Sequence, residues 1–275
     1  MTYVQALQQA QQAGLPRIEA QMLLLHVLGR LLHERAWLLA HDDAALTPEQ
    51  AQALAALTAR RLNGEPVAYL TGRKAFYGLE LAVDARVLDP RDDTETLVDW
   101  ALDLLPADGL ARALDLGTGS GAIALALAAQ RPQAEVWAVD TSADALTVAR
   151  ANAHRLGLNV QWLHGDWFSP TAGQRFDVIA SNPPYIAQGD PHLPALVHEP
   201  QQALVSGADG LDDIRRIVQG APPHLAPGGW LLLEHGWHQA AAVRHLLAAA
   251  GFTQVQSRRD LNDVERCSGG LWKAP

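Results

Sequence analysis

The four residues Asn182-Pro183-Pro184-Tyr185 combine a rigid backbone with a side-chain amide and an aromatic ring. Two consecutive prolines fix φ at both positions and push the residue before them into an extended conformation. The Asn182 side-chain oxygen and the Pro183 carbonyl are therefore two hydrogen-bond acceptors held in fixed positions. Tyr185 can pack on a flat group and exclude water from it. A strand-to-loop exit that is merely rigid would not require the asparagine or the tyrosine.

The chemistry that suits two fixed acceptors is reaction at a planar nitrogen that carries two hydrogens. An amide nitrogen is a poor nucleophile because its lone pair is delocalised into the carbonyl, as the rotation barrier of roughly 18–20 kcal/mol reflects. Accepting both hydrogens increases the electron density on nitrogen and aims it at an electrophile. Transfer from a sulfonium methyl donor then depends mostly on positioning and needs no metal. We therefore assign Asn182, Pro183 and Tyr185 to catalysis and residues 182–185 to substrate binding.

A glycine-rich loop, residues 115–121, precedes a helical stretch over 122–127. Glycines let the backbone turn sharply and approach a ligand, and a helix N-terminus offers unpaired N–H groups. The spacing of Gly117, Gly119 and Ala122 also fits a dinucleotide pattern, so the loop alone does not separate NAD from S-adenosylmethionine. The residues of this loop that we expect to bind the cofactor are Asp115, Gly117, Thr118, Gly119, Ser120 and Gly121.

Two acidic positions farther along the chain extend the cofactor site. Asp140 can accept hydrogen bonds from ribose hydroxyls in either cofactor class. Asp166 and Trp167 can bind an aminopurine through a carboxylate and a covering ring, although Asp166 could equally be a turn residue or a helix N-cap. Asp115 favours S-adenosylmethionine over NAD, because a carboxylate attracts the methionine ammonium and repels a pyrophosphate. Asn182 completes the expected cofactor set.

These residues follow segments that are predicted to be strands, with helical stretches between most of them. The alternation predicts an α/β fold, a Rossmann-like parallel sheet covered on both faces. Ligands of such sheets bind at the carboxyl ends of the strands, near the point where the strand order reverses. The predicted strands cover residues 113–116, 135–139, 160–164, 177–180 and 230–233.

Residues 1–72 are rich in Ala, Leu and Gln and predict a small all-helical domain that recognises the substrate. Apolar residues recur with a helical period over 18–39, with one interruption at Gly29. The sequence Thr47-Pro48-Glu49-Gln50 predicts a helix N-terminus, and that helix can continue to Leu62 and stop at Asn63-Gly64.

A linker over 73–93 is expected to hold a β-hairpin, with strands at 76–83 and 86–88 around Asp84-Ala85. The domain that binds S-adenosylmethionine then covers residues 94–275. It is expected to open with a helix over 94–105 that ends before Pro106.

The bulk composition narrows the possible partners. The 275 residues include 21 Lys and Arg against 30 Asp and Glu, so the formal net charge is −9. Proteins that bind the phosphates of a nucleic acid normally carry a local excess of Lys and Arg, so we do not expect a nucleic acid partner for this acidic chain. Cys267 is a single cysteine, His235 and His238 do not form a convincing metal site, and we expect no metal. Neither a signal peptide nor an apolar run long enough for a bilayer is evident, so we expect a cytoplasmic protein without a membrane partner.

A set of motifs extends over almost the whole chain: Arg60-Arg61, Gly64-Glu65-Pro66, Tyr69 to Gly72, Pro90-Arg91, Thr94-Glu95, Asp115 to Gly121, Asp140, Asp166 to Phe168, Asn182 to Tyr185, Glu199-Pro200, Glu234 to Gly236 and Glu265-Arg266. In these motifs the chain resembles the PrmC (HemK) family of peptide chain release factor glutamine methyltransferases. The resemblance implies methyl transfer from S-adenosylmethionine to the glutamine of the Gly-Gly-Gln motif in class I release factors, which makes these factors the expected partner. The competing hypotheses are an adenine-N6 methyltransferase of DNA or RNA, which shares the Asn-Pro-Pro-Tyr motif, and a binding protein without turnover.

The chain departs from the family pattern in two places. The usual Arg-Pro-Glu-Thr-Glu appears as Arg91-Asp92-Asp93-Thr94-Glu95, without the proline. The stretch from His192 to Glu199 is shorter than usual, which leaves the details of the peptide-facing loop open.

Overall fold

The computed structural model describes residues 1–273, so the last two residues of the domain predicted over 94–275 lie outside it. The chain divides into two compact units. The first, the helical unit, comprises Met1–Arg73 together with Pro194–His198, and the second, the sheet unit, comprises the rest. No helix in the described part of the chain is both long and apolar enough to cross a membrane.

The helical unit forms around an apolar core to which its helices contribute alanine and leucine side chains. Helix α4 starts after its N-cap Thr47, as the sequence predicts. The Thr47 hydroxyl accepts from the Gln50 backbone N–H, and the Gln50 side-chain oxygen accepts from the Thr47 backbone N–H. Asn63 ends that helix. The helices are α1 (Tyr3–Gln12), α2 (Arg17–Val27), α3 (Arg35–Ala40), α4 (Pro48–Leu62) and α5 (Val67–Thr71).

The interruption expected at Gly29 is a break between two helices. Helix α2 ends at Val27, Gly29 adopts φ +68°, and α3 starts at Arg35. Arg61 of α4 pairs with Glu19 of α2 at 2.7 Å, which ties the second helix to the fourth within this unit.

The predicted position of the hairpin is wrong. Its strands are β1 (Arg73–Phe76) and β2 (Leu79–Ala82), so the turn lies at Tyr77-Gly78 and not at Asp84-Ala85. Both turn residues have positive φ, 48° and 75°, as a tight hairpin turn requires. Tyr77 is an unusual residue there, and its backbone N–H is held by the Glu95 carboxylate at 2.7 Å. Asp84 instead accepts hydrogen bonds from Arg86, in a segment without strand structure.

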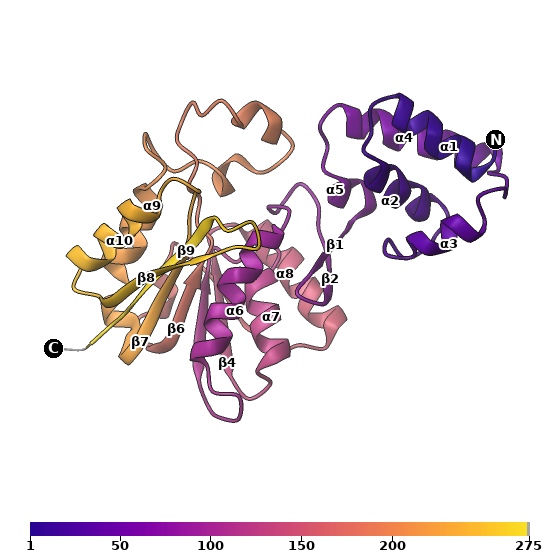
Figure 1. Cartoon of the computed structure of the whole chain (residues 1–275). Coiled ribbons are helices and arrows are strands. Elements are labelled where there is room, and N and C mark those ends of the chain that lie inside the picture. Colours follow the sequence, from indigo (N-terminus) through magenta and orange to yellow (C-terminus); the bar gives the residue numbers. More distant parts are fainter. Residues whose placement is uncertain (274–275) are drawn as a thin grey trace. The chain divides into compact units, whose positions relative to one another are not determined.

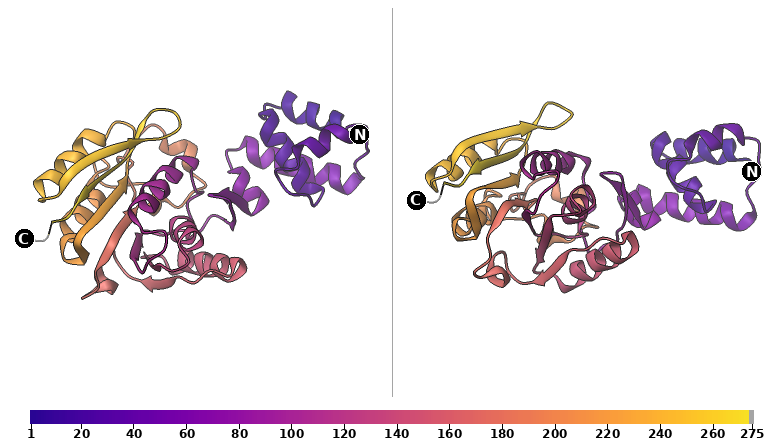
Figure 2. Two further views of the ribbon diagram at one scale, coloured as in Figure 1. Left: turned by 60° about the horizontal axis from the view of Figure 1, so that its bottom comes forward. Right: turned by 90° about the horizontal axis from the view of Figure 1, so that it is seen from below.

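The sheet unit is built on a seven-stranded sheet with the order β5-β4-β3-β6-β7-β9-β8. The five predicted strands are confirmed and pair in parallel. Two strands that the sequence did not predict, β8 and β9, add an antiparallel edge, drawn in yellow in Figures 1 and 2. The strands are β3 (Arg112–Leu116), β4 (Glu135–Asp140), β5 (Gln161–His164), β6 (Phe176–Ser181), β7 (Leu225–Glu234), β8 (Thr253–Arg259) and β9 (Glu265–Leu271).

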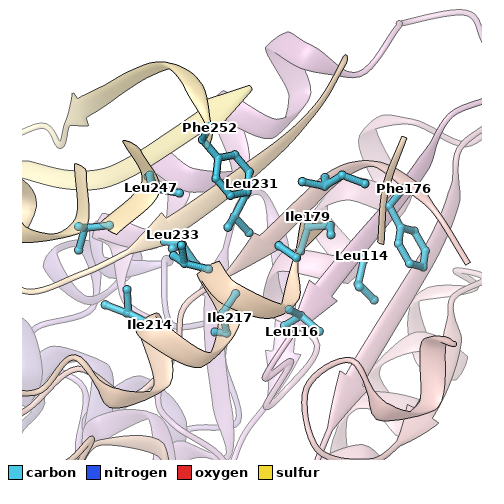
Figure 3. Packing of buried hydrophobic residues seen from close by; sticks show 14 of the residues in the cluster. Leu114, Leu116, Phe176, Ile179, Ile214, Ile217, Leu231, Leu233, Leu247 and Phe252 are labelled. Atoms are coloured by element: carbon cyan, nitrogen blue, oxygen red, sulfur yellow. The ribbon is translucent and has the colours of Figure 1, made fainter. Parts of the chain in front are cut away.

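Helices cover both faces of this sheet, as the alternation predicts (Figure 1). Helices α9 and α10 pack on the face that carries Leu114, Leu116 and Leu231, and Figure 3 shows these side chains with those of the helices. Helices α6 and α7 contact each other and the opposite face. The predicted helix over 94–105 is confirmed as α6. The helices are α6 (Glu95–Leu104), α7 (Ala122–Gln130), α8 (Ala143–Leu156), α9 (Asp212–Gly220) and α10 (Ala240–Ala249).

One buried side chain joins the hairpin to the glycine-rich loop. Asn152 of α8 is fully buried. Its Oδ1 accepts from the Ala82 N–H at 2.7 Å, and its Nδ2 donates to the carbonyls of Ala82 and Ser120, each at 3.0 Å. The amide therefore satisfies backbone groups of β2 and of the loop at the same time.

We expect Asn152→Ala to destabilise the sheet unit by about 2–4 kcal/mol, from roughly 1 kcal/mol for each of three hydrogen bonds. Differential scanning calorimetry of the intact chain measures the loss as a lower Tm. The control is Asn262→Ala, which removes an exposed side chain at a residue that hydrogen-bonds through its backbone N–H. Equal Tm values for the two variants would contradict a joining role for Asn152.

Candidate active site

The strand register gathers the predicted site residues at one edge of the sheet. Leu116 at the end of β3 aligns with Val139 of β4 and with Ser181 of β6. The chain therefore continues from these three strands side by side, into the glycine-rich loop, Asp140 and Asn182. The order of the sheet reverses between β3 and β6, which is where parallel sheets open a crevice for a ligand.

A cavity of about 190 Å³ opens at this edge, far more than the roughly 10–15 Å³ that one water needs. Each loop at the carboxyl ends of β3, β4, β5 and β6 contributes to its wall. Seven of the predicted site residues line it, namely Gly117, Gly119, Asp140, Asp166, Trp167, Asn182 and Pro184. The other six predicted residues, Asp115, Thr118, Ser120, Gly121, Pro183 and Tyr185, are not part of the wall.

The glycine-rich loop supplies both a cavity wall and a packing contact. Gly119 has open space where a Cβ would stand, whereas Gly121 has Leu125, Trp162 and Ala149 within 3.3 Å of that position. Gly121 also has φ +86° and precedes α7. A side chain at Gly121 would thus be strained in its backbone and crowded by the helices and β5. Gly121 therefore packs against α7, α8 and β5, whereas Gly119 faces the cavity.

Asp140, the last residue of β4, joins that strand to the glycine-rich loop. Its Oδ2 accepts from the Gly119 N–H and its Oδ1 from the Ser142 N–H, each at 2.8 Å. Burial raises the pKa of the Asp140 carboxyl, although these backbone donors oppose the rise. The half-buried carboxylate lines the cavity and is placed to accept hydrogen bonds from a diol.

Asp115 lies beneath the loop and is fully buried. Its Oδ2 accepts from the Thr118 hydroxyl at 2.6 Å and from the Ala124 N–H at 3.2 Å, so it holds the loop against the start of α7. Its Oδ1 has no hydrogen-bond partner among the described residues. Burial raises the pKa of this carboxyl to about 7. An unpartnered buried carboxylate oxygen beside the loop is a group that a cation would stabilise.

Asp166 and Trp167 form the wall next to the end of β5. Asp166 is exposed and pairs with Arg216 of α9 at 2.5 Å, a partner that the sequence did not suggest. Trp167 adopts φ +45°, and its ring lies 3.5 Å from the Cβ position of Gly117. The tryptophan ring thus covers the glycine-rich loop at the cavity, where it offers a flat apolar face.

The Asn-Pro-Pro-Tyr segment begins where β6 ends. Ser181 donates its hydroxyl to the Leu116 carbonyl at 2.7 Å and so fixes this end to β3. Asn182 donates its Nδ2 to the Thr94 hydroxyl at 3.2 Å, while Pro183 is buried. Tyr185 donates its hydroxyl to the Glu234 carboxylate at 3.4 Å, and burial raises the pKa of the Tyr185 phenol. Two side chains from elsewhere in the chain therefore hold the motif from below.

Sequence reasoning missed several wall residues. Arg86, Val87 and Leu88 come from the segment predicted as a strand, and no motif distinguishes them. Pro200, Gln202 and Ala203 come from the long connection after Tyr185, and Asp213 and Arg216 from α9. The motif Glu199-Pro200, which the chain shares with the family, was the sequence signal for this connection. Buried Glu199 pairs with Arg91 at 2.5 Å, and this pair holds the connection in place.

The histidines considered as metal ligands are engaged elsewhere. The ring of buried His235 hydrogen-bonds through Nδ1 to the Gly236 carbonyl and through Nε2 to the Ser268 hydroxyl. His238 packs edge-on against Trp237. Within residues 1–273, no group of three or more His, Cys, Asp or Glu side chains is placed to hold a metal ion.

Comparison with protein families and curated proteins finds relatives over nearly the whole chain. The family described as "Methyltransferase small domain" matches residues 99–211, and "PrmC N-terminal domain" matches residues 2–72. A release factor glutamine methyltransferase of Bordetella pertussis is 54% identical over 94% of this chain and 95% of its own. Proteins of the same name from Xylella fastidiosa and Escherichia coli are 51% and 48% identical, covering 92% and 98% of this chain and 92% and 96% of their own.

Solved structures show the same fold. A methyltransferase from Pyrococcus furiosus aligns with a TM-score of 0.56 at 21% identity, over 80% of this chain and all of its own. A 16S rRNA methyltransferase from T. thermophilus, solved with AdoMet and guanosine, aligns with a TM-score of 0.53 at 23% identity, over 74% and 50% of the two chains. The sheet unit therefore has the class I methyltransferase fold, which contains the Rossmann-like α/β sheet that the sequence predicts.

We expect Asp140→Ala to weaken binding of S-adenosylmethionine by about 1.5–3 kcal/mol, the scale of hydrogen bonds to a charged group. Isothermal titration calorimetry measures the affinity. Asp144→Ala is the control, since Asp144 is an exposed acid in the first turn of α8 and should change the Kd by no more than about twofold. An unchanged affinity in Asp140→Ala would remove Asp140 from the cofactor site.

Proposed function

The chain belongs to the release factor glutamine methyltransferase family, and from this membership we propose its reaction and its substrate. It transfers a methyl group from S-adenosylmethionine to the side-chain amide nitrogen, N5, of the glutamine in the Gly-Gly-Gln motif of class I release factors. The observation that carries the proposal is 54% identity, over almost the full length of both chains, to a relative named for this reaction.

The residues of the cavity fit this cofactor. Asp140 offers carboxylate oxygens for the ribose hydroxyls, and the Trp167 ring offers a flat surface for the adenine. Asp166 is the acceptor for the adenine amine, for which it would exchange part of its pairing with Arg216. Asp115 lies beneath the loop and outside the cavity wall, and its unpartnered Oδ1 suits the methionine ammonium because a cation nearby compensates a buried negative charge. When bound, S-adenosylmethionine supplies a methyl group on a sulfonium, and S-adenosylhomocysteine is the product.

The Asn-Pro-Pro-Tyr segment prepares the glutamine amide for attack. The Asn182 side-chain oxygen and the Pro183 carbonyl accept the two N–H hydrogens, which places the nitrogen lone pair toward the methyl group. Tyr185 packs on the amide plane and excludes water. In the reaction the amide nitrogen would take the methyl group from the sulfonium, which would leave as the thioether, and the cationic amide would then lose one N–H proton to solvent as the product departs. These residues act by positioning, so the expected rate gain comes from geometry.

A protein substrate suits the charge of the molecule better than a nucleic acid does. The formal net charge is −9, and the cavity wall carries Asp140, Asp166 and Asp213 against Arg86 and Arg216. A phosphate backbone would be repelled by this balance, because its binding depends on an excess of Lys and Arg. We therefore favour release factors over DNA or RNA adenines, and we place the reaction in the cytoplasm, where translation terminates.

Transfer of radiolabelled methyl from S-adenosylmethionine to purified class I release factor tests the function directly. The expected result is label on the Gly-Gly-Gln glutamine, located by peptide mass spectrometry, with none on duplex DNA or ribosomal RNA. Label on adenine in place of the release factor would overturn the substrate assignment.

Asn182→Ala should lower kcat by about 10²-fold or more while the affinity for S-adenosylmethionine stays within a few-fold. The reason is that Asn182 aims the amide nitrogen, an interaction that matters most in the transition state. Single-turnover rates at saturating substrate and a calorimetric Kd separate the two effects. A near-normal kcat would transfer the acceptor role to Pro183 alone.

The helical unit is proposed to recognise the release factor and to take no part in chemistry. It has its own apolar core and matches a family domain of its own over residues 2–72. A glutamine in a short glycine-flanked loop offers little contact area, so a second contact must supply the binding energy that holds the amide in place.

Deleting residues 1–72 should therefore lower kcat/KM for intact release factor by at least about tenfold, the effect of losing roughly 1.4 kcal/mol of binding. Cofactor affinity and the rate on a short Gly-Gly-Gln peptide should change much less. Circular dichroism checks that the shortened chain is folded. A folded variant with full activity on intact release factor would contradict the recognition role.

A further inference from the structure

One buried side chain connects the Asn-Pro-Pro-Tyr segment to two other loops at the same edge of the sheet. Gln239 directly precedes α10 and is 3% exposed. Its Oε1 accepts from the Gly236 N–H at 2.8 Å, and its Nε2 donates to the Tyr185 carbonyl at 3.0 Å. The same Nε2 donates to the carbonyls of Asp209 and Gly210 at 3.3 and 3.4 Å. The amide therefore joins the loop after β7, the motif and the loop before α9.

The orientation of the Gln239 amide follows from the groups around it. A backbone N–H can only donate and a backbone carbonyl can only accept. Oε1 faces one N–H and Nε2 faces three carbonyls, so a rotation of the amide by 180° would leave none of these four hydrogen bonds. A buried polar group without partners is costly, and this cost keeps the amide in one orientation.

Helix capping does not explain where this side chain points. Gln239 stands at the N-cap of α10, a position whose side chain often accepts from N–H groups of the first helical turn. Among the described residues, the Gln239 side chain makes no such hydrogen bond to α10. Its polar atoms contact the motif and the neighbouring loops instead.

The main chain at Tyr185 is fitted closely to this contact. Gly210 has φ +76°, and a Cβ there would overlap the Tyr185 carbonyl oxygen and stand 2.8 Å from Gln239 Nε2. The next residue after the motif, Ile186, forms a parallel β-bridge with Val205. The chain is therefore held at the Tyr185 carbonyl and again one residue later.

We propose that Gln239 is a positioning residue for methyl transfer, whose amide sets the main chain at Tyr185 and with it the tyrosine ring that packs on the substrate amide. This rests on the proposed function, which gives the ring that role. Gln239 lies outside the cavity wall and so acts through Tyr185. The Tyr185 hydroxyl is held by a long hydrogen bond to Glu234, 3.4 Å, and the main-chain contact fixes the other end of the residue.

The first test is Gln239→Met, which keeps the length of the side chain and removes both polar groups. The single-turnover rate on release factor should fall roughly 10- to 100-fold, the effect of misplacing a reacting group. The Kd of S-adenosylmethionine should stay within about threefold. The control is Gln161→Met, which removes a side-chain amide that donates to Glu135 at 2.7 Å, and it should keep the wild-type rate. A wild-type rate in Gln239→Met would overturn the proposal.

A double-mutant cycle separates positioning from a general loss of stability. Tyr185→Ala removes the ring through which Gln239 acts, so Gln239→Met should change the rate by less than about twofold in that background. A loss of stability alone would lower the rate by the same factor with and without the ring. Equal factors in the two backgrounds would therefore overturn the proposal.

A second variant disturbs the same carbonyl while Gln239 stays intact. Gly210→Ala should lower the rate on release factor as Gln239→Met does, and it should again have little effect in Tyr185→Ala. The matched control is Gly228→Ala, because Gly228 also has positive φ, +83°, but open space at its Cβ position. Both substitutions carry similar backbone strain, and only the first meets Tyr185. Equal rates in the two variants would contradict the proposal.

The Tyr185 carbonyl is observable by NMR without any reaction. The chain has four tyrosines, so labelling with [1-¹³C]tyrosine gives four carbonyl signals, and the one lost in Tyr185→Phe belongs to Tyr185. This signal should shift in Gln239→Met, which lacks the hydrogen bond, and stay in place in Gln161→Met. A chain that shows the shift but methylates no release factor would place the failure in the proposed function and not in the contact. An unmoved signal in Gln239→Met would overturn the positioning role even in an active enzyme.

Discussion

Parallel pairing of β3 with β6 is the constraint on which the site depends. These two strands follow one another in space but not along the chain, and Leu116 pairs with Ser181 at their ends. The next residue after each strand is Gly117 or Asn182, so the glycine-rich loop and the Asn182 amide emerge together. A slip of one residue would turn alternate side chains to the other face and carry Asn182 away. The hydroxyl of Ser181, bonded to the Leu116 carbonyl at 2.7 Å, helps to exclude that slip.

Two carboxylates lie in the interior near this edge of the sheet, Asp115 of β3 and Glu234 of β7. Asp115 and Glu234 are fully buried, and burial raises each pKa to about 7. Their ordinary values are 3.8 and 4.5, so the folded state binds more protons than the unfolded chain between these values and about 7. Each group therefore contributes stability that is fully present below its ordinary value and lost as the pH rises through about 7. An ionised Asp115, which the proposed contact with the methionine ammonium requires, thus costs stability that an apolar residue would not.

The sequence predicted those parts of the molecule whose physical cause is local. Five strands, the helix that starts at Thr47 and the loops after β3 and β6 follow from periodicity, capping and the sterics of glycine and proline. Strand β9 was missed because its Gly269 and Gly270 are poor strand formers. They are required by neighbours such as Leu232, Trp100 and Phe252, which lie within 3.0 Å of where a Cβ would stand. The hairpin was misplaced because Tyr77 adopts positive φ, which Glu95 supports from 18 residues away. Such contacts between residues far apart in the sequence leave no periodic pattern from which they could be predicted.

The cavity edge alone does not define the substrate, since an rRNA methyltransferase shares the fold of the sheet unit. What distinguishes this chain must come from the segments that surround that edge. The connection after Tyr185 contributes Pro194–His198 to the helical unit and then supplies Pro200, Gln202 and Ala203 to the cavity wall. Arg91 and buried Glu199 fix it between those two contributions. One covalent segment thus belongs both to the unit proposed to bind the partner and to the wall of the cavity. Under the proposed function, selection of a protein loop over a base would therefore depend on what can reach Asn182 and would need no change in its proposed acceptor role.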